Sequence, residues 1–254
     1  APAAPALPEV VSRNLESSRM VLLQSGGWQV FFHYGQLTRS HAQAEALNFA
    51  ASYGDTDITH DPGTVGYGSP RHREYYTRGL SHNVPLVNGE GQEPPQPGEL
   101  LAFSADPARV SARQPAYRKA ARASRTLAIA GGALVDTATI ESTGGTQRLG
   151  LALHVQGKAR LPASFAADAQ FAANRPAAFG YWRTARRATY QDRATIEVDY
   201  GRVVLRITFE APGEFTLWHG SAPDIPPRRR EGFYLELAGR ATAATFTTSF
   251  VPVR

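Results

Sequence analysis

Histidine and tyrosine side chains are concentrated between positions 33 and 82 of this 254-residue chain. Five of the seven histidines lie there, interleaved with five tyrosines. They are His33, Tyr34, His41, Tyr53, His60, Tyr67, His72, Tyr75, Tyr76 and His82. Imidazole changes its charge near neutral pH, and a buried imidazole must find hydrogen-bond partners. A β-sandwich core rarely needs so many of these groups, so this segment is the predicted site of any chemistry.

The segment 40–46 carries polar residues at every second position, where His41, Gln43 and Glu45 alternate with alanines. On an extended chain these three side chains share one face, and the alanines allow close packing on the other. Alanine, glutamine and glutamate are also good helix formers. The pattern therefore leaves a strand and a helix as alternatives.

Several kinds of active site are excluded by what the sequence lacks. It has no cysteine, which excludes thiolate catalysis, cysteine-ligated zinc and disulfides. The phosphate-binding loop GxxxxGKS/T, the zinc motif HExxH and the nucleophile motif GxSxG are absent from the sequence. The stretch 55–59 begins like a calcium loop, but His60 replaces the required glycine and Gly66 the final glutamate. No organic cofactor is predicted.

The basic residues are almost all arginine, which indicates an anionic partner. The chain has 27 Lys and Arg residues against 22 Asp and Glu, a formal net charge of +5, and all but two of the 27 are arginine. The planar guanidinium group matches carboxylate, sulfate or phosphate. Basic clusters interleaved with aromatic residues would indicate a nucleic-acid partner, and none is predicted here. No apolar stretch approaches the length of a membrane span.

Two arginine-rich segments are predicted to lie on the surface. The run Arg228–Arg230 follows two prolines and is predicted to form an exposed turn. The segment 107–125 is predicted to be a short helix or a basic loop, with its arginines in solvent. Neither segment is predicted to form a binding patch.

Short strands joined by turns account for most of the sequence, because 23 glycines and 18 prolines argue against a helical bundle. Residues 20–32 are predicted to form two strands around a Ser-Gly-Gly turn, 88–98 a loop, and 199–202 a hairpin turn. Further strands are predicted at 57–59, 84–87, 127–129, 134–141, 148–155, 194–200, 203–210, 214–219, 232–237 and 244–251. The predicted fold class is all-β: two stacked antiparallel sheets, a β-sandwich of the supersandwich type, with few short helices.

Five motifs occur in order within residues 41–92. They are His41–Phe49 (HAQAEALNF), His60–Gly63 (HDPG), Tyr67–Gly68 (YG), Arg73–Asn83 (REYYTRGLSHN) and Val87–Gln92 (VNGEGQ). This ordered set resembles the C-terminal β domain of the heparinase II/III-like polysaccharide lyases, a group that includes heparin/heparan sulfate lyases and oligoalginate lyases. Weaker similarity extends the resemblance over nearly the whole chain from Ser18.

The resemblance implies an enzyme that cleaves acidic polysaccharides containing uronic acid, such as alginate or heparan sulfate, by β-elimination. Relatives carry an α/α toroid domain ahead of the β domain, and the active-site cleft lies between the two. On this basis 18–254 is the β-sandwich domain and 1–17 a linker or N-terminal extension, while the toroid is absent from this chain. The expected location is periplasmic or secreted.

The resemblance also implies roles for individual side chains. His41 matches a histidine that faces the cleft, as a base or as a neutraliser of the uronate carboxylate. Tyr76 matches a catalytic aromatic residue, for which contact with the sugar and packing in the core are alternatives. The expected substrate-binding residues are Arg39, Tyr67, Arg78 and Asn83. The C5 proton of a uronide is weakly acidic, so such a site must neutralise the carboxylate and stabilise the charge that forms.

Many members of the group hold a structural zinc ion, and the matching positions here are Gln43, Asp61 and His82. An amide oxygen is a poor zinc ligand, so a bound zinc ion and a metal-free Asp61–His82 hydrogen bond are alternatives. Glu45 stands where the family has aspartate, which is a milder change. The altered ligand set also leaves a second interpretation of the whole chain: a non-catalytic carbohydrate-binding or scaffold β domain.

Overall fold

The computed structural model describes residues 9–253, and the first strand begins inside the expected N-terminal extension. Strand β1 (Arg13–Leu15) pairs with β2 (Met20–Ser25), so the first sheet starts before the boundary expected at Ser18. Residues 1–8 of the expected linker lie outside the described residues.

Five consecutive strands form the first sheet, in the order β1-β2-β3-β4-β5. Strands β3 (Trp28–His33), β4 (Asn48–Tyr53) and β5 (Thr56–Thr59) complete it. Ser25 pairs with Trp28, which confirms the predicted hairpin. Gly26, in the turn, has φ +53°, a conformation that glycine adopts without the clash of a Cβ.

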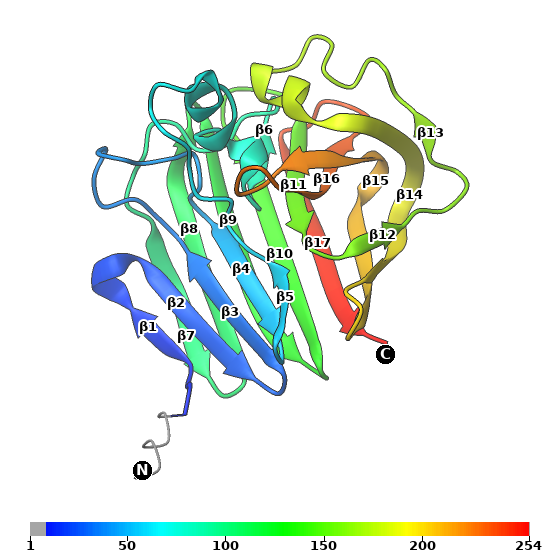
Figure 1. The fold of residues 1–254 in the computed structure, drawn as a ribbon. Coiled ribbons are helices and arrows are strands. Elements are labelled where there is room, and N and C mark those ends of the chain that lie inside the picture. Colours follow the sequence, from blue (N-terminus) through cyan, green and yellow to red (C-terminus); the bar gives the residue numbers. More distant parts are fainter. Residues whose placement is uncertain (1–8, 254) are drawn as a thin grey trace.

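The second sheet has twelve strands, in the order β6-β11-β16-β15-β17-β10-β9-β8-β7, with β12, β13 and β14 continuing it beyond β15. Their bounds are β6 Pro85–Val87, β7 Glu99–Ala105, β8 Ala108–Arg118, β9 Ala121–Ala130, β10 Ala133–Ser142, β11 Leu149–Val155, β12 Lys158–Arg160, β13 Ala166–Ala167, β14 Arg183–Asp199, β15 Val204–Pro223, β16 Arg229–Leu237 and β17 Ala243–Pro252. Figure 1 shows the first sheet lying over the part of the second sheet formed by β7 to β10. The long β14–β15 hairpin lies at the right of the view, beyond the edge of the first sheet.

The two sheets enclose one large apolar core that draws side chains from both of them. On β15 apolar side chains at every second position face this core, and Leu205, Ile207 and Phe209 are fully buried. Burying a side chain of this size contributes about 1.5–3 kcal/mol relative to leaving it in water. The all-β class with two stacked antiparallel sheets is confirmed.

The helices are short, as predicted, and several lie at one end of the sandwich (Figure 1). They are η1 Glu16–Ser18, η2 His72–Tyr76, η3 Gly79–Ser81 and η4 Ala177–Tyr181. A second, smaller apolar cluster, built around Tyr75, Trp182 and Tyr234, packs η2, η3 and η4 against the second sheet. Within residues 9–253, no helix has the length and apolarity needed to cross a bilayer.

Two predictions about the strands are wrong. The stretches 203–210 and 214–219 belong to a single strand, β15. The segment 107–125 forms β8 and part of β9 instead of a helix or a loop, and its residues alternate between buried and exposed. That alternation places Arg125 on the buried face, where its side chain is fully enclosed.

Candidate functional site

Two stretches of the histidine-rich region meet at one end of the sandwich. One is the loop between β3 and β4, and the other is the segment 60–83 between β5 and β6. The Ala44 N–H donates to the Thr77 carbonyl (3.1 Å), and the Asn83 N–H donates to Oδ1 of Asn48 (2.9 Å). The sheet thus brings together motifs that are distant in the sequence.

The segment 40–46 is an irregular loop, so neither alternative left by the sequence is correct. His41 has φ +59° and Leu47 has φ +68°. Positive φ values interrupt both strands and helices and are unfavourable for residues with a Cβ. Such strain, of order 1 kcal/mol or more, persists only where the surrounding structure imposes it, and it clusters at functional sites. The loop therefore holds His41 in one defined orientation.

An exposed row of rings begins at His41. Its Nδ1 is hydrogen-bonded to the hydroxyl of Tyr67, which is 62% exposed. The Tyr67 ring meets the ring of His72 edge to face, with centroids 4.6 Å apart, and His72 Nδ1 lies 2.9 Å from Oγ1 of Thr64. We call His41, Tyr67 and His72 the His–Tyr row. It offers proton donors and acceptors in mutual contact at the surface, as acid–base chemistry on a bound ligand requires.

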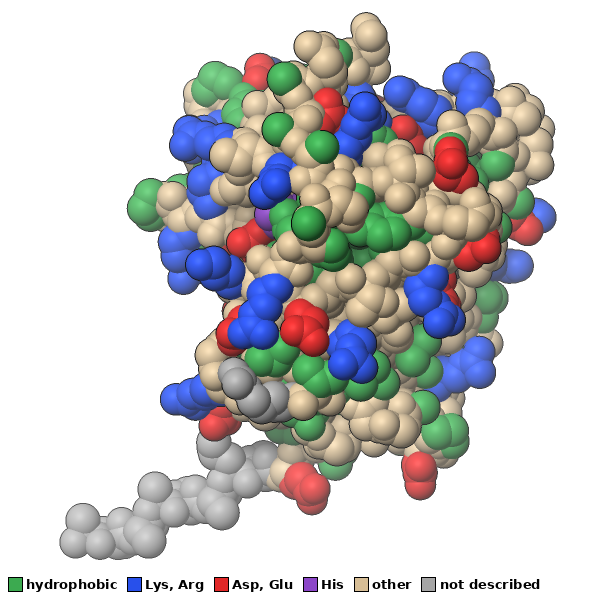
Figure 2. Space-filling model, turned by 90° about the vertical axis from the view of Figure 1, so that its right-hand side faces the viewer, with side chains coloured by type: hydrophobic (Ala, Val, Ile, Leu, Met, Phe, Trp, Pro, Cys, Tyr) green, Lys and Arg blue, Asp and Glu red, His purple; other side chains and the backbone are tan. Residues whose placement is uncertain are grey.

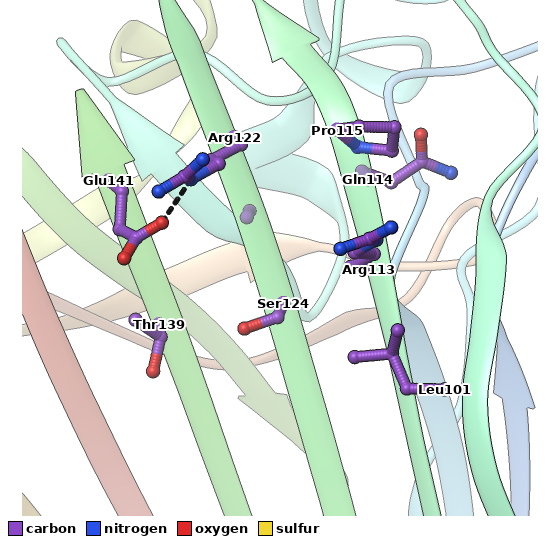
Figure 3. A pocket seen from close by; sticks show the side chains of 9 residues that line it. Leu101, Arg113, Gln114, Pro115, Arg122, Ser124, Thr139 and Glu141 are labelled. Carbon is purple, nitrogen blue, oxygen red and sulfur yellow. Dashed lines mark hydrogen bonds and ion pairs between the residues drawn. The ribbon is translucent and has the colours of Figure 1, made fainter. Parts of the chain in front are cut away.

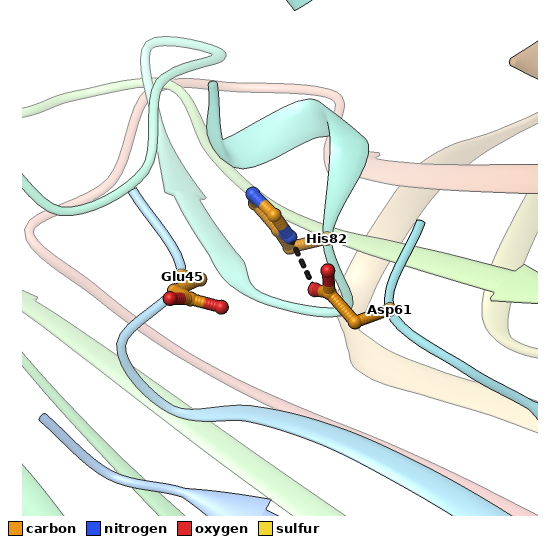
Figure 4. A group of neighbouring side chains, drawn as sticks. All are labelled: Glu45, Asp61 and His82. Carbon is orange, nitrogen blue, oxygen red and sulfur yellow. Dashed lines mark hydrogen bonds and ion pairs between the residues drawn. The ribbon is translucent and has the colours of Figure 1, made fainter. Parts of the chain in front are cut away.

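Next to this row, Asp61 and His82 form a hydrogen-bonded pair (Figure 4). Asp61 Oδ2 lies 2.7 Å from Nδ1 of buried His82 and also accepts from the Asn48 side chain (2.8 Å). Nε2 of His82 lies 3.1 Å from the Tyr76 carbonyl. Both ring nitrogens face hydrogen-bond acceptors, but a neutral imidazole carries only one N–H. With the proton on Nε2, Nδ1 therefore needs either a second proton or a bound cation. Burial acts to lower the pKa of His82, but the Asp61 carboxylate outweighs it and the pKa is raised.

Glu45 completes a group of three ionisable side chains that could hold a metal ion. Ligand atoms of Glu45, Asp61 and His82 all lie within 4.8 Å of one another, and Figure 4 shows the Glu45 carboxylate directed toward the other two. The sequence analysis named Gln43 instead of Glu45. Gln43 is nearby, with Nε2 3.5 Å from the Gly63 carbonyl and its buried Oε1 lacking a hydrogen-bond partner among the described residues. The sequence feature that could have identified Glu45 as a metal ligand is its place in the alternating pattern of residues 41–45.

Arg230 connects the two ends of the segment 60–83 through hydrogen bonds to the backbone. Its side chain is buried, and it donates to the carbonyls of His60 (2.5 Å) and Ser81 (2.6 Å). The predicted exposed turn at 228–230 is therefore wrong for Arg230. Burial lowers the pKa of Arg230, and the carboxylates of Asp224 and Asp61 offset part of the cost of burying its charge.

Two residues predicted to contact the substrate, Tyr76 and Asn83, are buried. The Tyr76 hydroxyl donates to the Asp224 carbonyl (2.7 Å), and burial raises its pKa. The Asn83 side chain donates to the Phe49 carbonyl (2.9 Å) and to Oγ1 of Thr59 (2.7 Å). Buried polar groups are normally satisfied by such internal bonds. Both residues therefore hold the loops together. Tyr76 packs in the core, the second of its two alternatives, and the expectation that Asn83 contacts a sugar is corrected.

The predicted arginines remain at the surface. Arg39 and Arg78 are both exposed. The Nε of Arg78 donates to the Arg73 carbonyl (2.7 Å), and Arg78 follows Thr77, the residue that binds the His41 loop. Their guanidinium groups are thus accessible to solvent.

A fourth histidine of the region, His60, connects β5 to the chain after β15. Its Nδ1 lies 2.6 Å from Asp57 and its Nε2 2.9 Å from buried Asp224. The hydrogen bonds that His60 donates to the carboxylates of Asp224 and Asp57 raise its pKa to about 9. The sequence analysis gave His60 no role beyond its motif, since the second carboxylate lies 164 positions away in the chain.

The raised pKa of His60 predicts a loss of stability at alkaline pH. A group whose pKa is higher in the folded than in the unfolded chain stabilises the folded state when it is protonated. For His60 this contribution is complete below the unfolded pKa of about 6.5 and is lost as pH rises through about 9. We expect a loss of about 1–2 kcal/mol in unfolding free energy between pH 6.5 and 10, after allowance for the partial exposure of the ring. Urea unfolding across this range measures it. In His60→Gln the decline should be reduced, and an unchanged decline would contradict the assignment.

A separate surface hollow of about 490 Å³ lies on the exposed face of β8, β9 and β10 (Figure 3). Its two arginines already have acidic partners: Arg122 binds Glu141 and Arg113 binds Glu99. No histidine or tyrosine lines it. Its lining carboxylate, Glu141, is already bound by Arg122, so we place the functional site at the His–Tyr row.

The family of heparinase II/III-like C-terminal domains matches residues 10–154, more than half of the chain. The chain belongs to this family. The match spans the first sheet, the His–Tyr row and the Glu45–Asp61–His82 group. The comparison with curated protein sequences gives no match for the heparinase-like domain.

Solved structures support the same fold. A heparinase III with methylated lysines superposes on 98% of this chain with a TM-score of 0.69 and 12% identity. A heparan sulfate lyase HepC mutant from Pedobacter heparinus covers 97% of it with a TM-score of 0.68 and 12% identity. This chain spans only 36% and 37% of the length of those two proteins. The Slr1438 protein of Synechocystis sp. PCC 6803 matches over 98% of this chain and 99% of its own, with a TM-score of 0.56 and 12% identity.

Proposed function

We propose that this domain is the β-sandwich half of a polysaccharide lyase that cleaves acidic polysaccharides containing uronic acid, such as alginate or heparan sulfate, by β-elimination. The observation that carries the proposal is the exposed His41–Tyr67 contact, presented by a loop whose backbone is held at positive φ. The family match over residues 10–154 supports it. A purely structural imidazole would be expected in the interior, with both nitrogens satisfied by the protein.

The reaction requires two proton movements. A base removes the proton on C5, the C4–O4 bond breaks as a C4=C5 double bond forms, and an acid protonates the departing O4. His41 acts as the base or neutralises the carboxylate beside C5, and the hydrogen-bonded Tyr67 hydroxyl lies beside it at the same surface. Arg39 and Arg78 offer guanidinium groups to anionic substituents of the chain.

The other wall of the cleft is proposed to come from an α/α toroid domain. The match to only about a third of the two heparinase chains supports a larger functional unit. The proposed location is periplasmic or secreted, where a polymeric glycan is accessible.

An absorbance assay tests the proposed function. The full-length gene product is incubated separately with alginate, heparan sulfate, hyaluronan and glucuronan, and the ultraviolet absorbance of the unsaturated uronide is followed. A rise with one of these polymers is expected. Saturable binding of an acidic glycan with no absorbance rise on any polymer would contradict the lyase and support a carbohydrate-binding module.

The donor set at Glu45, Asp61 and His82 fits a structural zinc ion. Two carboxylates and an imidazole are suitable zinc ligands, and their ligand atoms lie within 4.8 Å of one another. The Nε2 of His82 faces the Tyr76 carbonyl, the arrangement that fixes a ligating histidine with its other nitrogen toward the metal. We propose that these residues hold zinc, which would tie the His41 loop to the segment 60–83.

Zinc is therefore expected to stabilise the protein. At a free concentration about 100 times its Kd, a ligand that binds only the folded state adds about 2.7 kcal/mol to the unfolding free energy. Melting curves with Zn²⁺ and with a chelator measure the effect. Glu45→Gln should remove most of it while leaving the Asp61–His82 hydrogen bond in place. The exposed Glu93→Gln should retain it in full. Equal melting temperatures with and without zinc would instead favour the metal-free pair.

A further inference from the structure

Three chain segments meet at Tyr181, the last residue of η4. The ring of Tyr181 packs against Tyr75 of η2, with centroids 5.7 Å apart, and its hydroxyl donates to Glu74. The Tyr181 carbonyl accepts a hydrogen bond from Nη2 of Arg229 (2.8 Å). The start of η2, the end of η4 and the start of β16 therefore lie side by side at this end of the sandwich.

Each of these segments contributes one arginine. Arg71 directly precedes η2, and Arg183 begins β14 two residues after Tyr181. Arg183 pairs in the sheet with Ser221, whose Oγ accepts a hydrogen bond from Nε of Arg229 (2.8 Å). Arg71 and Arg183 are exposed, while Arg229 is partly buried and fixed by its bonds to Ser221 and Tyr181.

These three guanidinium groups have no carboxylate partner among residues 9–253. Two acidic side chains of these segments have other partners: Glu74 accepts from Tyr181, and Glu231 binds His219. Burial lowers the pKa of Arg229, and the positive charges of Arg183 and Arg71 lower it further. Like charges gathered without a counter-charge are unfavourable, and the binding of an anion relieves that repulsion.

We propose that Arg71, Arg183 and Arg229 form an anion subsite that binds a sulfate or carboxylate substituent of the glycan chain. This inference rests on the proposed function. Arg71 is adjacent in sequence to His72, whose ring contacts Tyr67, so the subsite continues the His–Tyr row along the same surface. In the space-filling view, several basic side chains lie along the upper part of the face that carries β14 (Figure 2).

The number of guanidinium groups favours sulfate over carboxylate. Each guanidinium is a planar fork that binds oxyanions through charge-assisted hydrogen bonds. A sulfate ester has three terminal oxygens, one for each arginine, whereas a carboxylate has two. The subsite would therefore select a glycan that carries sulfate at some distance from the uronate bound at His41.

A double variant, Arg71→Gln/Arg183→Gln, tests the subsite. Arg229 is left in place because it connects Tyr181 to Ser221. The control is Arg206→Gln, an exposed arginine on β15 without a partner among the described residues. The first measurement is the melting temperature in sodium sulfate against sodium chloride at equal ionic strength. Sulfate should raise the melting temperature of the unsubstituted protein and of the control, but not that of the double variant.

The second measurement is calorimetric titration with a heparin hexasaccharide and with an unsulfated glucuronan hexasaccharide. The double variant should bind the sulfated ligand at least about 10-fold more weakly, the loss of roughly 1.4 kcal/mol of binding free energy. An equal loss for the unsulfated ligand would assign the subsite to carboxylate. Unchanged affinity for both ligands, with sulfate still stabilising the double variant, overturns the subsite but leaves the His41 chemistry standing. Glycan binding that the double variant loses, without elimination on any polymer, overturns the lyase function alone and leaves the subsite standing.

Discussion

Replacing His41 with alanine is expected to lower the rate of uronide elimination by about 10²- to 10⁴-fold, the range that a positioned acid–base group contributes. His41 is exposed, its Nδ1 is bonded to Tyr67, and its backbone is held at φ +59°. Replacement by alanine removes the imidazole but loses few packing contacts, because the side chain is exposed. The fold should therefore survive, and the loss should appear in kcat on the polysaccharide that gives the absorbance rise.

Two further variants separate chemistry from loop structure. Tyr67→Phe keeps the ring against His72 but removes the hydroxyl bonded to His41, so activity should fall while the melting temperature changes little. Leu37→Ala changes an exposed side chain in the same β3–β4 loop and should leave kcat unchanged. If His41→Ala retains most of the activity at an unchanged melting temperature, His41 has no catalytic role.

The pattern of the strands could be predicted where residues alternate clearly. Around 203–209 the branched and aromatic residues recur at every second position, next to a turn at Gly201, and the structure buries that face. The segment 107–125 was missed because arginine and alanine carry no strand signal of their own. Arg125 fits a strand only because of a partner on a different strand, Asp136. Asp136 itself lies among apolar residues on the inner face of β10, and that misplaced charge was the available signal.

For the site, the resemblance carried by the sequence pairs Asp61 with His82, which the fold joins by a hydrogen bond, and names His41 and Tyr67 singly, which the fold brings into contact. It could not separate exposed from buried polar residues. Asn83 was assigned to the substrate, but its amide bonds internal carbonyl and hydroxyl groups. A polar residue inside a motif has the same appearance in the sequence whether it serves a ligand or the backbone. Burial, which distinguishes the two, depends on strands far away in the chain.

Breaking the buried Arg125–Asp136 pair is expected to cause the largest loss of stability. The guanidinium binds both carboxylate oxygens, at 2.7 and 2.6 Å, and both side chains are fully buried. Removing one partner leaves an unpaired charge in the core, which costs about 3–5 kcal/mol. For a domain of this size that corresponds to a fall in melting temperature of about 10 °C, from roughly 2–4 °C per kcal/mol. Thermal unfolding of Arg125→Met and Asp136→Asn measures it.

A matched control lies on the neighbouring strand. Arg113 on β8 pairs with Glu99, but both side chains are about half exposed. Pairs in water contribute about 0–1 kcal/mol, so Arg113→Met should change the melting temperature by no more than a few degrees. A loss for Arg125→Met no larger than for Arg113→Met would contradict the buried pair.

Arg125 also connects the core to the functional site, so its loss is expected to affect metal binding as well as stability. Nη1 of Arg125 donates to the carbonyls of Leu47, where the His41 loop ends, and of Asn83, next to His82. A double variant, Arg125→Met/Asp136→Leu, removes both charges and should recover much of the lost stability. It cannot restore the donors to those two carbonyls. We therefore expect this double variant to melt near the unsubstituted protein but to bind zinc more weakly, because the loops that carry Glu45 and His82 lose their common anchor.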